Sequence, residues 1–354
     1  PSPSPGHVVC CPSCPSGRAP VGLVASGTVH NALARAAFLL SSYAIHFTMA
    51  YLLDPQDYGT LGVVISLVTI SRVFLSAGVA QSTAHFMARH PERAAAIWRS
   101  AVKVQMTASV AIVALYLGAA WLWTSAIEAP DLLRYLAFAA PMVVLMAWHQ
   151  INLAYFNGRL WFGRQALLVT LYAIARALLA VTLAAVGFAV WGVIAGLMIA
   201  TALVGIAGVL AIPRGKPGSQ HPWRRLVTFS APLVVVALAT SILLNADILI
   251  LKSFFPDSDD VGFYNGAMNL GKAPYFVFYA VAVTLLPGIS KAHEEHGREA
   301  ARAVAARSVS YLLLAAIPVA VIVAATAPKL LDFVYLASFA AGGAALSALI
   351  VSTC

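Results

Sequence analysis

Apolar segments of about 20 residues recur along nearly the whole chain, and the connections between them alternate between basic and acidic side chains. A segment of that length can cross the hydrocarbon core of a bilayer, which is about 30 Å thick. Charged residues make up only 10% of the sequence, against about 25% in a typical soluble domain. The pattern therefore predicts an all-α polytopic membrane protein and leaves no room for a soluble catalytic domain.

Hydropathy predicts about ten transmembrane helices. In chain order they are Asn31–Leu53, Gly59–Val79, Ala101–Thr124, Asp131–Phe156, Gln165–Phe188, Val190–Ile212, Leu226–Phe254, Gly262–Ile289, Ala303–Ala325 and Ala337–Val351. The last of these is short for a membrane span.

The charged connections predict how these helices are oriented. Connections after the even spans are basic, whereas most of those after the odd spans are short and acidic. The basic residues are Arg89, Arg93, Arg99, Lys103, Arg159, Arg164, Arg214, Lys216, Arg224, Arg225, Lys291, Arg298, Arg302 and Arg307, and the acidic ones Asp54, Asp57, Glu128, Asp131, Asp257, Asp259 and Asp260. Because Lys and Arg beside membrane spans stay in the cytoplasm, we expect a cytoplasmic N-terminus. The formal net charge of +9 follows from this topology, so no nucleic-acid partner is expected.

The region before the first span differs in composition from the rest. Residues 1–29 are rich in Pro, Ser and Gly and predict a disordered tail. Its cysteines Cys10, Cys11 and Cys14 lack a second ligand pair at zinc-finger spacing, so we expect no metal site and no cofactor.

Two outer connections resemble each other and suggest an internal repeat. The first span ends in Leu-Leu-Asp-Pro-Gln-Asp-Tyr-Gly (52–59), and the seventh ends in Phe-Phe-Pro-Asp-Ser-Asp-Asp-Val-Gly (254–262). An offset of six spans predicts two parallel lobes around a central cavity, a recurrent transporter plan. The lobes would be residues 30–213, with six helices, and 226–354, with about four, joined by a cytoplasmic linker at 214–225. The alternative is that any outer hairpin has such a sequence.

The stretch from Tyr51 to Gly59, followed by Ala80-Gln81-Ser82, resembles polysaccharide transporters, the Wzx-type oligosaccharide flippases of the multidrug/oligosaccharidyl-lipid/polysaccharide exporter superfamily. Asn245-Ala246-Asp247, Val261 to Ala267 and Leu286-Pro287-Gly288 resemble the second half of that family. The resemblance implies a multi-pass protein of the bacterial cytoplasmic (inner) membrane that flips an undecaprenyl-diphosphate-linked oligosaccharide, with a polysaccharide polymerase and export machinery as further partners. Such proteins have twelve to fourteen spans, so we expect the sequence to be truncated.

Ionisable residues inside the spans are the candidate site residues, because a charge at membrane depth costs about 2.5–3.5 kcal/mol on insertion scales. Arg72 and Lys272 lie on the order of 20 Å and 15 Å from the outer ends of the second and eighth spans. Arg176 lies midway in the fifth span, and Arg35 lies near the inner end of the first. We expect these four cations to bind an anionic substrate in the cavity. The alternatives are salt bridges or carbonyl contacts for Arg72 and Lys272, and snorkelling to lipid headgroups for Arg35.

Asp247 is the acidic residue that we place inside a span. It is a candidate ion-coupling site, or otherwise the counter-ion of Lys252 or Lys272. Nearby Asn245 is expected to form an interhelical hydrogen bond. His46 and His149 are expected to be packing residues within their spans rather than proton relays.

Enzyme motifs are absent from the sequence, so we expect a transporter and not an enzyme. His293-Glu294-Glu295-His296 has its histidines three apart rather than four, unlike the H-E-x-x-H zinc motif. The leading hypothesis is flipping of a lipid-linked oligosaccharide by alternating access. A cation-coupled multidrug exporter of the same superfamily is the first alternative, although it would favour an acidic cavity. A membrane-embedded glycan-processing enzyme is the second, and short outer loops argue against it.

Overall fold

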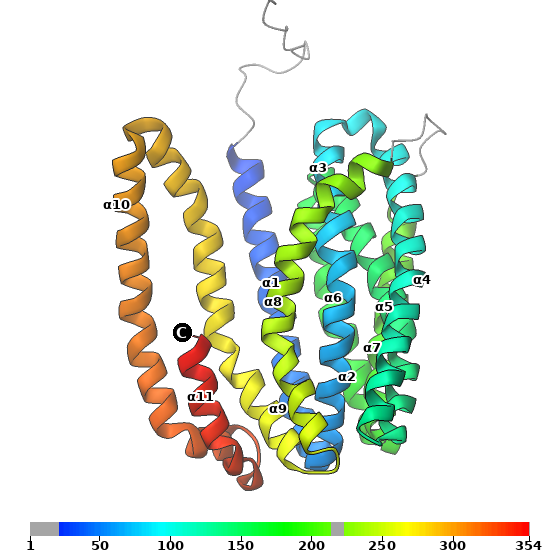
Figure 1. Ribbon diagram of the computed structural model, residues 1–354. Coiled ribbons are helices and arrows are strands. Elements are labelled where there is room, and N and C mark those ends of the chain that lie inside the picture. The colour runs from blue at the N-terminus through cyan, green and yellow to red at the C-terminus, as the bar shows by residue number, and fades with distance from the viewer. Residues whose placement is uncertain (1–20, 214–222, 354) are drawn as a thin grey trace, which may run out of the picture.

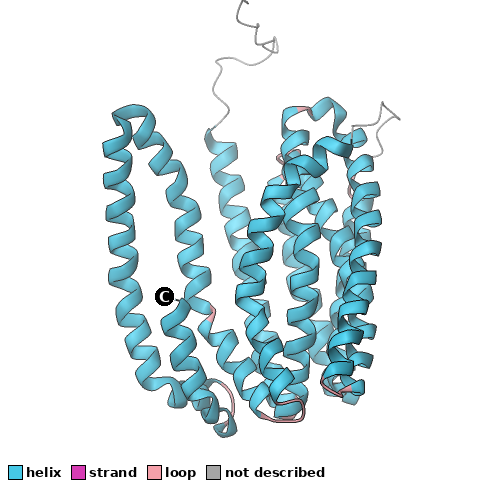
Figure 2. Ribbon diagram, in the orientation of Figure 1, coloured by secondary structure: helices cyan, strands magenta, loops and turns pink. Residues whose placement is uncertain are grey.

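The chain folds into a bundle of long helices that run roughly side by side (Figure 1). The computed structural model describes residues 21–213 and 223–353, and all regular elements within these ranges are helices (Figure 2). The cysteines of the tail and most of the predicted linker at 214–225 lie outside the described residues. The helices are α1 Val21–Leu52, α2 Pro55–Val73, α3 Ala80–Arg89, α4 Ala94–Ala126, α5 Pro130–Gly158, α6 Phe162–Leu183, α7 Ala189–Leu210, α8 Trp223–Phe254, α9 Asp260–Gly271, α10 Ala273–Val334 and α11 Gly343–Thr353.

Six stretches of the described residues are long and apolar enough to cross a membrane. They are Pro55–Arg89, Pro91–Ala126, Pro130–Gly158, Phe162–Leu210, Arg224–Phe254 and Gly297–Val334. The prediction of an all-α polytopic membrane protein is confirmed, whereas the count of ten spans is not.

Two positive-φ glycines divide long helical stretches. Gly187 has φ +105°, and there the chain reverses so that α6 and α7 pack against each other, where two spans were predicted. Gly297 has φ +80° and divides α10 near the point where the eighth and ninth spans were expected to separate. A residue without a Cβ adopts this left-handed backbone conformation without steric cost, so both reversals fall at glycine.

Two predicted helices differ from the structure in ways that their sequences explain. The first was predicted to begin at Asn31, but α1 begins at Val21, so the predicted disordered tail extends too far. No proline separates Val21 from Pro55 to stop the helix earlier. The eighth was predicted to be continuous, but it is interrupted at Lys272, between α9 and α10. Pro274 has no N–H to donate to the carbonyl of Leu270, so one helical hydrogen bond is missing across the break.

The second predicted span is longer than expected and contains a π-helical turn. Helix α2 continues through the π-helical turn Phe74–Val79 into α3, so the helical run reaches Arg89 rather than Val79. A π-helical turn inserts one extra residue into an α-helix and leaves a backbone carbonyl without its usual partner. This irregularity begins two residues after Arg72.

The first seven helices pack mainly among themselves, whereas α9, α10 and α11 form a second group (Figure 1). Helix α1 packs against α6, α4 against α5, and α5 and α6 both against α7. Helix α8 packs along α2 and its π-helical turn, and α9 crosses α2. Contact between the two groups is therefore concentrated on α2.

The crossing of α2 and α9 brings the two predicted repeats into direct contact. A Cβ on Gly59 would lie 2.7 Å from the backbone nitrogen of Gly262, and Gly62 lies against the side chain of Asn265. Asn265 Nδ2 donates a hydrogen bond of 2.9 Å to the carbonyl oxygen of Tyr58. When Gly59 is aligned with Gly262, Gly62 falls on Asn265, so equivalent positions of the repeat meet across the crossing.

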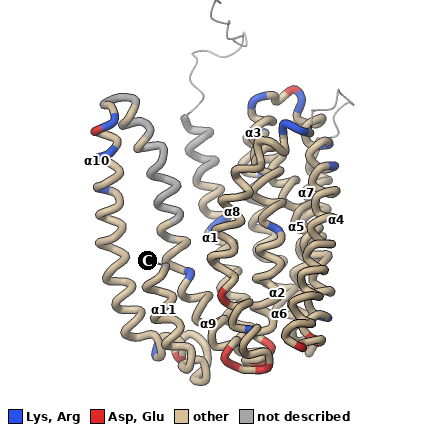
Figure 3. Tube along the Cα trace, in the orientation of Figure 1, with Lys and Arg blue, Asp and Glu red and all other residues tan. Residues whose placement is uncertain are grey.

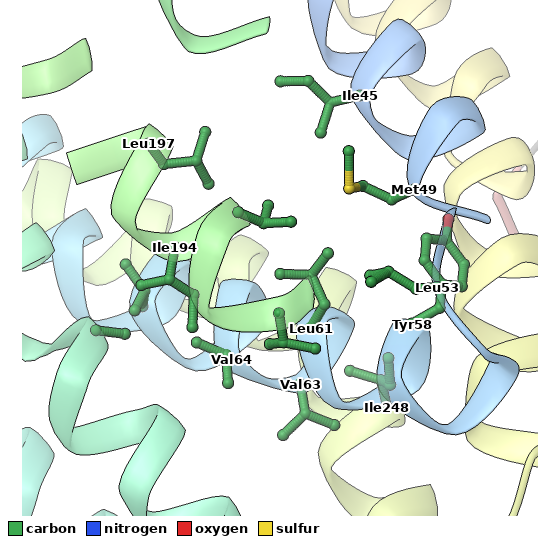
Figure 4. Close-up of a cluster of buried hydrophobic side chains, with 14 of the residues drawn as sticks. Ile45, Met49, Leu53, Tyr58, Leu61, Val63, Val64, Ile194, Leu197 and Ile248 are labelled. Carbon is green, nitrogen blue, oxygen red and sulfur yellow. The ribbon is translucent and has the colours of Figure 1, made fainter. Parts of the chain in front are cut away.

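A large buried hydrophobic cluster surrounds this crossing (Figure 4). Its labelled members come from α1 and the turn after it, α2, α7 and α8: Ile45, Met49, Leu53, Tyr58, Leu61, Val63, Val64, Ile194, Leu197 and Ile248. The same cluster includes Val261 and Ala267 of α9, so side chains from both groups of helices are packed in one core.

Charges separate along the bundle. Figure 3 shows most described Lys and Arg at the end that holds α3 and the turn within α10, and most Asp and Glu at the opposite end, beside α9. The α2–α9 crossing therefore lies at the acidic end, the end predicted to face outward.

Candidate functional site

A cavity of about 330 Å³ lies between α1, α2, α5, α6, α7 and the junction of α9 with α10. Its lining combines cationic, aromatic, polar and aliphatic side chains. They are Phe38, Leu39, Ser42, Tyr43, Ile45, His46, Ile65, Val68, Thr69, Arg72, Met142, Met146, His149, Gln150, Tyr172, Arg176, Leu197, Asn269, Lys272 and Phe276. Three of the four cations predicted from the sequence therefore meet in one cavity, whose lining comes from both groups of helices.

Arg72 is located in the last turn of α2. It lines the cavity, and within the described part of the chain its guanidinium group makes no hydrogen bond or ion pair. A guanidinium group carries five donors in a planar fork, which suits carboxylate and phosphate oxygens. Arg72 therefore offers unused hydrogen-bond donors to the cavity.

The π-helical turn that follows Arg72 is supported by Gln105 of α4. The fully buried Gln105 Nε2 donates to the carbonyl oxygens of Leu75 at 3.0 Å and of Ala147, on α5, at 3.2 Å. Leu75 lies inside the turn, where an α-helical donor is missing. Gln105 of α4 thus connects α5 with the π-helical turn that follows Arg72.

Lys272 lies at the interruption between α9 and α10. Its Nζ donates a hydrogen bond of 3.2 Å to Oδ1 of Asn245 on α8, which confirms the interhelical bond expected for Asn245. The break removes Lys272 from a regular helix, and its ammonium group lines the cavity. When Gly59 is aligned with Gly262, Lys272 falls on Thr69, one turn before Arg72, so the two cations lie at similar but not equivalent positions of the repeat.

Arg176 of α6 is held by neutral groups of α1. Its guanidinium group donates to the hydroxyls of Ser41 and Ser42 and to the carbonyl oxygen of Phe38. It also lies 3.8 Å from the centroid of the Phe38 ring, within cation–π distance. Arg176 therefore joins α1 to α6, and no described carboxylate forms an ion pair with it.

The cavity is lined by positive charges without negative charges among the lining residues. Arg72 and Arg176 are close enough for their like charges to repel each other, and no Asp or Glu is found among the lining residues. In a medium of low dielectric constant, clustered like charges are costly unless an opposite charge joins them. An anion placed between Arg72, Arg176 and Lys272 would relieve that cost.

Asp247 does not line this cavity and is not in an ion pair within the described residues. Its Oδ2 accepts a 2.7 Å hydrogen bond from the hydroxyl of Tyr264, and its Oδ1 accepts one of 2.9 Å from the N–H of Ile248. Neither Lys252 nor Lys272 forms an ion pair with Asp247 among the described residues, although Asp247 is close enough to Lys272 for an electrostatic interaction. Each oxygen of its carboxylate accepts one hydrogen bond from a protein donor instead.

Arg35 is exposed on α1 and lies outside the cavity lining. Residues four and seven positions further along, Leu39 and Ser42, line the cavity, so Arg35 lies on the same helix face, one turn beyond it. This position is toward the basic end of the bundle.

Several uncharged lining residues were not singled out from the sequence. His46 and His149, interpreted as packing residues, both line the cavity, and His149 also packs against the ring of Tyr172 with centroids 5.0 Å apart. Asn269 and Tyr172 contribute further polar groups. These residues could have been identified from the sequence as amide, imidazole and phenol groups inside apolar spans, where polar groups are costly.

The fold is that of known membrane transporters. The chain is similar to the inward-facing conformation of a multidrug resistance MATE family transporter of the MOP superfamily, with a TM-score of 0.69 and 14% identity over 89% of this chain and 78% of that one. It is also similar to a MATE structure in complex with MaD5 (TM-score 0.62, 12% identity, 94% and 79% covered). A third similar structure is a MOP superfamily transporter from Pyrococcus furiosus, described as having a binding pocket of reversed polarity that suggests a different function (TM-score 0.53, 14% identity, 94% and 84% covered).

The sequence comparison identifies the family. No curated protein matches the chain. The family model described as polysaccharide biosynthesis protein matches residues 48–341, which include α2 to α10 and the cavity residues Arg72, Arg176 and Lys272. The resemblance noted in the sequence is thereby confirmed, and the chain belongs to the polysaccharide biosynthesis protein family.

Proposed function

We propose that this protein is a flippase that moves an undecaprenyl-diphosphate-linked oligosaccharide across the bacterial cytoplasmic membrane by alternating access. The observation that carries the proposal is the cavity in which Arg72, Arg176 and Lys272 meet without a carboxylate in the lining. A diphosphate is a compact anion with several oxygens, and guanidinium and ammonium groups bind such anions with charge-assisted hydrogen bonds.

In this proposal, the lipid-linked substrate enters at the basic end of the bundle, which the distribution of Lys and Arg predicts to be cytoplasmic. Arg35 lies on the α1 face that leads toward the cavity and would attract the diphosphate first. The α2–α9 crossing closes the acidic end, so the cavity would be reached from the cytoplasm. The prenyl chain would stay in the bilayer, and separation of α2 from α9 would release the glycan outward, where a polysaccharide polymerase would receive it.

The alternative function is cation-coupled export of multiple drugs, which is favoured by the fold similarity to MATE transporters. In this alternative Asp247 would be the coupling site, because it is the acidic residue within α8 and its carboxylate is hydrogen-bonded to Tyr264 of α9. The positive cavity speaks against cationic drugs as substrates. We propose ion coupling at Asp247 for either substrate, since its protonation would alter the α8–α9 contact.

Proteoliposomes with a fluorescent diphosphate-linked glycolipid test the proposal directly. Arg72→Ala and Lys272→Ala are expected to reduce flipping at least tenfold while membrane insertion is unchanged. Arg134→Ala is the matched control, because it removes a surface cation that is paired with Asp131 at 2.9 Å. Wild-type flipping in both cavity variants would overturn the proposal. Transport of cationic dyes but not of the glycolipid would favour the exporter.

A further inference from the structure

The hydrogen-bond acceptors around the cavity cations are neutral. Lys272 donates to an amide oxygen, Arg176 donates to two hydroxyls and a carbonyl, and Arg72 has no acceptor within the described residues. We propose that Asn245 and Tyr264 are specificity-determining residues that hold Lys272 in the cavity while preventing its neutralisation by Asp247. This inference rests on the proposed function and deepens it, because it explains how the site stays positive beside a carboxylate.

Asn245 is oriented by its own helix. Its Nδ2 donates a 2.8 Å hydrogen bond to the carbonyl oxygen of Ser241 one turn earlier, and this bond turns Oδ1 toward Lys272. An amide oxygen fixes the position of the ammonium group but carries no charge. Lys272 is thus held in place with its full positive charge available to a ligand.

Asp247 is the carboxylate that could cancel that charge. It lies two residues from Asn245 on α8 and is close enough to Lys272 to interact with it electrostatically. Each of its oxygens already accepts one hydrogen bond, Oδ2 from the hydroxyl of Tyr264 and Oδ1 from the N–H of Ile248, and these bonds fix the orientation of the carboxylate. A carboxylate whose lone pairs accept such bonds is stabilised without an ion pair.

The hydroxyl of Tyr264 is therefore the group that keeps Asp247 from Lys272. Tyr264→Phe removes one donor from a half-buried carboxylate and retains the ring. The ammonium group of Lys272 already interacts electrostatically with Asp247, and its flexible stem allows it to move and replace the lost donor. An ion pair formed in this way competes with an anionic ligand for Lys272, so the variant is expected to lose diphosphate affinity.

The test uses the full-length protein in nanodiscs, titrated with undecaprenyl diphosphate. Tyr264→Phe is expected to weaken the binding of undecaprenyl diphosphate at least fivefold. Asn245→Asp is expected to weaken it more, because this substitution places a carboxylate directly beside Lys272. Tyr264→Phe combined with Asp247→Asn is expected to restore binding to within about twofold, since residue 247 then carries no charge that could pair with Lys272. Tyr311→Phe, at a residue 66% exposed, is the matched control. Unchanged binding in Tyr264→Phe, or failure of the double variant to restore it, would overturn the inference.

A second measurement does not depend on the ligand. Asp247 and Lys272 already interact electrostatically in the wild-type protein. The non-additivity between the effects of Asp247→Asn and Lys272→Ala on the melting temperature is therefore expected to be small in the wild-type protein and larger in the Tyr264→Phe background, where the two groups form an ion pair. Equal non-additivity in both backgrounds would overturn the inference and leave the proposed function intact. Absence of diphosphate binding by the wild-type protein would instead overturn the proposed function, together with the ligand preference inferred here.

Discussion

Gly59 of α2 lies directly against Gly262 of α9, so that a Cβ on Gly59 would come within 2.7 Å of the Gly262 nitrogen. The two glycines open equivalent segments of the predicted repeat, after the acidic turns that precede α2 and α9. Their contact brings the backbones of the two groups of helices together at the acidic end. Small residues commonly allow such close helix approach in membrane proteins.

Gly262→Ala is expected to weaken the α2–α9 crossing. The added Cβ would collide with the carbonyl oxygen of Pro55, which is backbone and cannot rotate away. The two helices must then separate, at a cost of about 1–3 kcal/mol typical of overpacking.

We expect greater accessibility of the acidic end, measured by the labelling rate of a cysteine introduced at Tyr58 in Gly262→Ala compared with the same cysteine alone. Gly118→Ala is the control, because nothing lies within 4 Å of its Cβ position. Equal labelling in all variants would contradict the expectation.

Arg176 and Arg72 are expected to differ in their effects on stability. Arg176→Met removes the donors to Ser41, Ser42 and the Phe38 carbonyl, and hydrogen bonds to charged groups contribute about 1.5–3 kcal/mol. Arg72→Met removes no hydrogen bond within the described residues. Thermal unfolding in detergent should therefore show a lower melting temperature for Arg176→Met than for Arg72→Met. A lower melting temperature for Arg72→Met would contradict the assignment of Arg176 as the link between α1 and α6.

Gln105→Leu is expected to destabilise the region around the π-helical turn. The change preserves much of the side-chain volume but leaves the carbonyl of Leu75, inside the π-helical turn, without this donor, and a buried unsatisfied group costs about 1–3 kcal/mol. Hydrogen exchange of residues 74–79 should be faster in the variant. The exposed Gln81→Leu, on α3, is the control and should leave exchange unchanged. Protection equal to that of the wild type in Gln105→Leu would show that the turn does not need this side chain.

The presence of long membrane helices was predictable from sequence because the bilayer imposes a simple rule. An apolar stretch must satisfy its backbone hydrogen bonds internally, so it forms a helix of about the bilayer thickness. The same rule marks charges at membrane depth as exceptional, which is why Arg72, Arg176 and Lys272 were candidates before their convergence was known. The position of Arg35 outside the cavity could not be predicted, because the sequence gives the depth of a residue along α1 but not the contacts of its side chain.

Local irregularities were harder to predict because several sequences tolerate them. Pro274 was a signal for the break at Lys272, yet prolines at 141 and 232 lie inside helices α5 and α8 without ending them. The π-helical turn after Arg72 receives a hydrogen bond from Gln105, which is about 30 residues away in the chain and has no local signature. Tertiary partners therefore decide which irregularities form.

The interruption at Lys272 also has a mechanical consequence. From Ala273 to the turn at Gly297 the first arm of α10 is a rigid lever of about 36 Å at 1.5 Å per residue. The end of this arm about which it could rotate is the interruption at Lys272, whose ammonium group lines the cavity. A rotation of about 10° about that end would carry the far tip through roughly 6 Å. A small movement beside Lys272 would thus become a larger displacement at the basic end of the bundle.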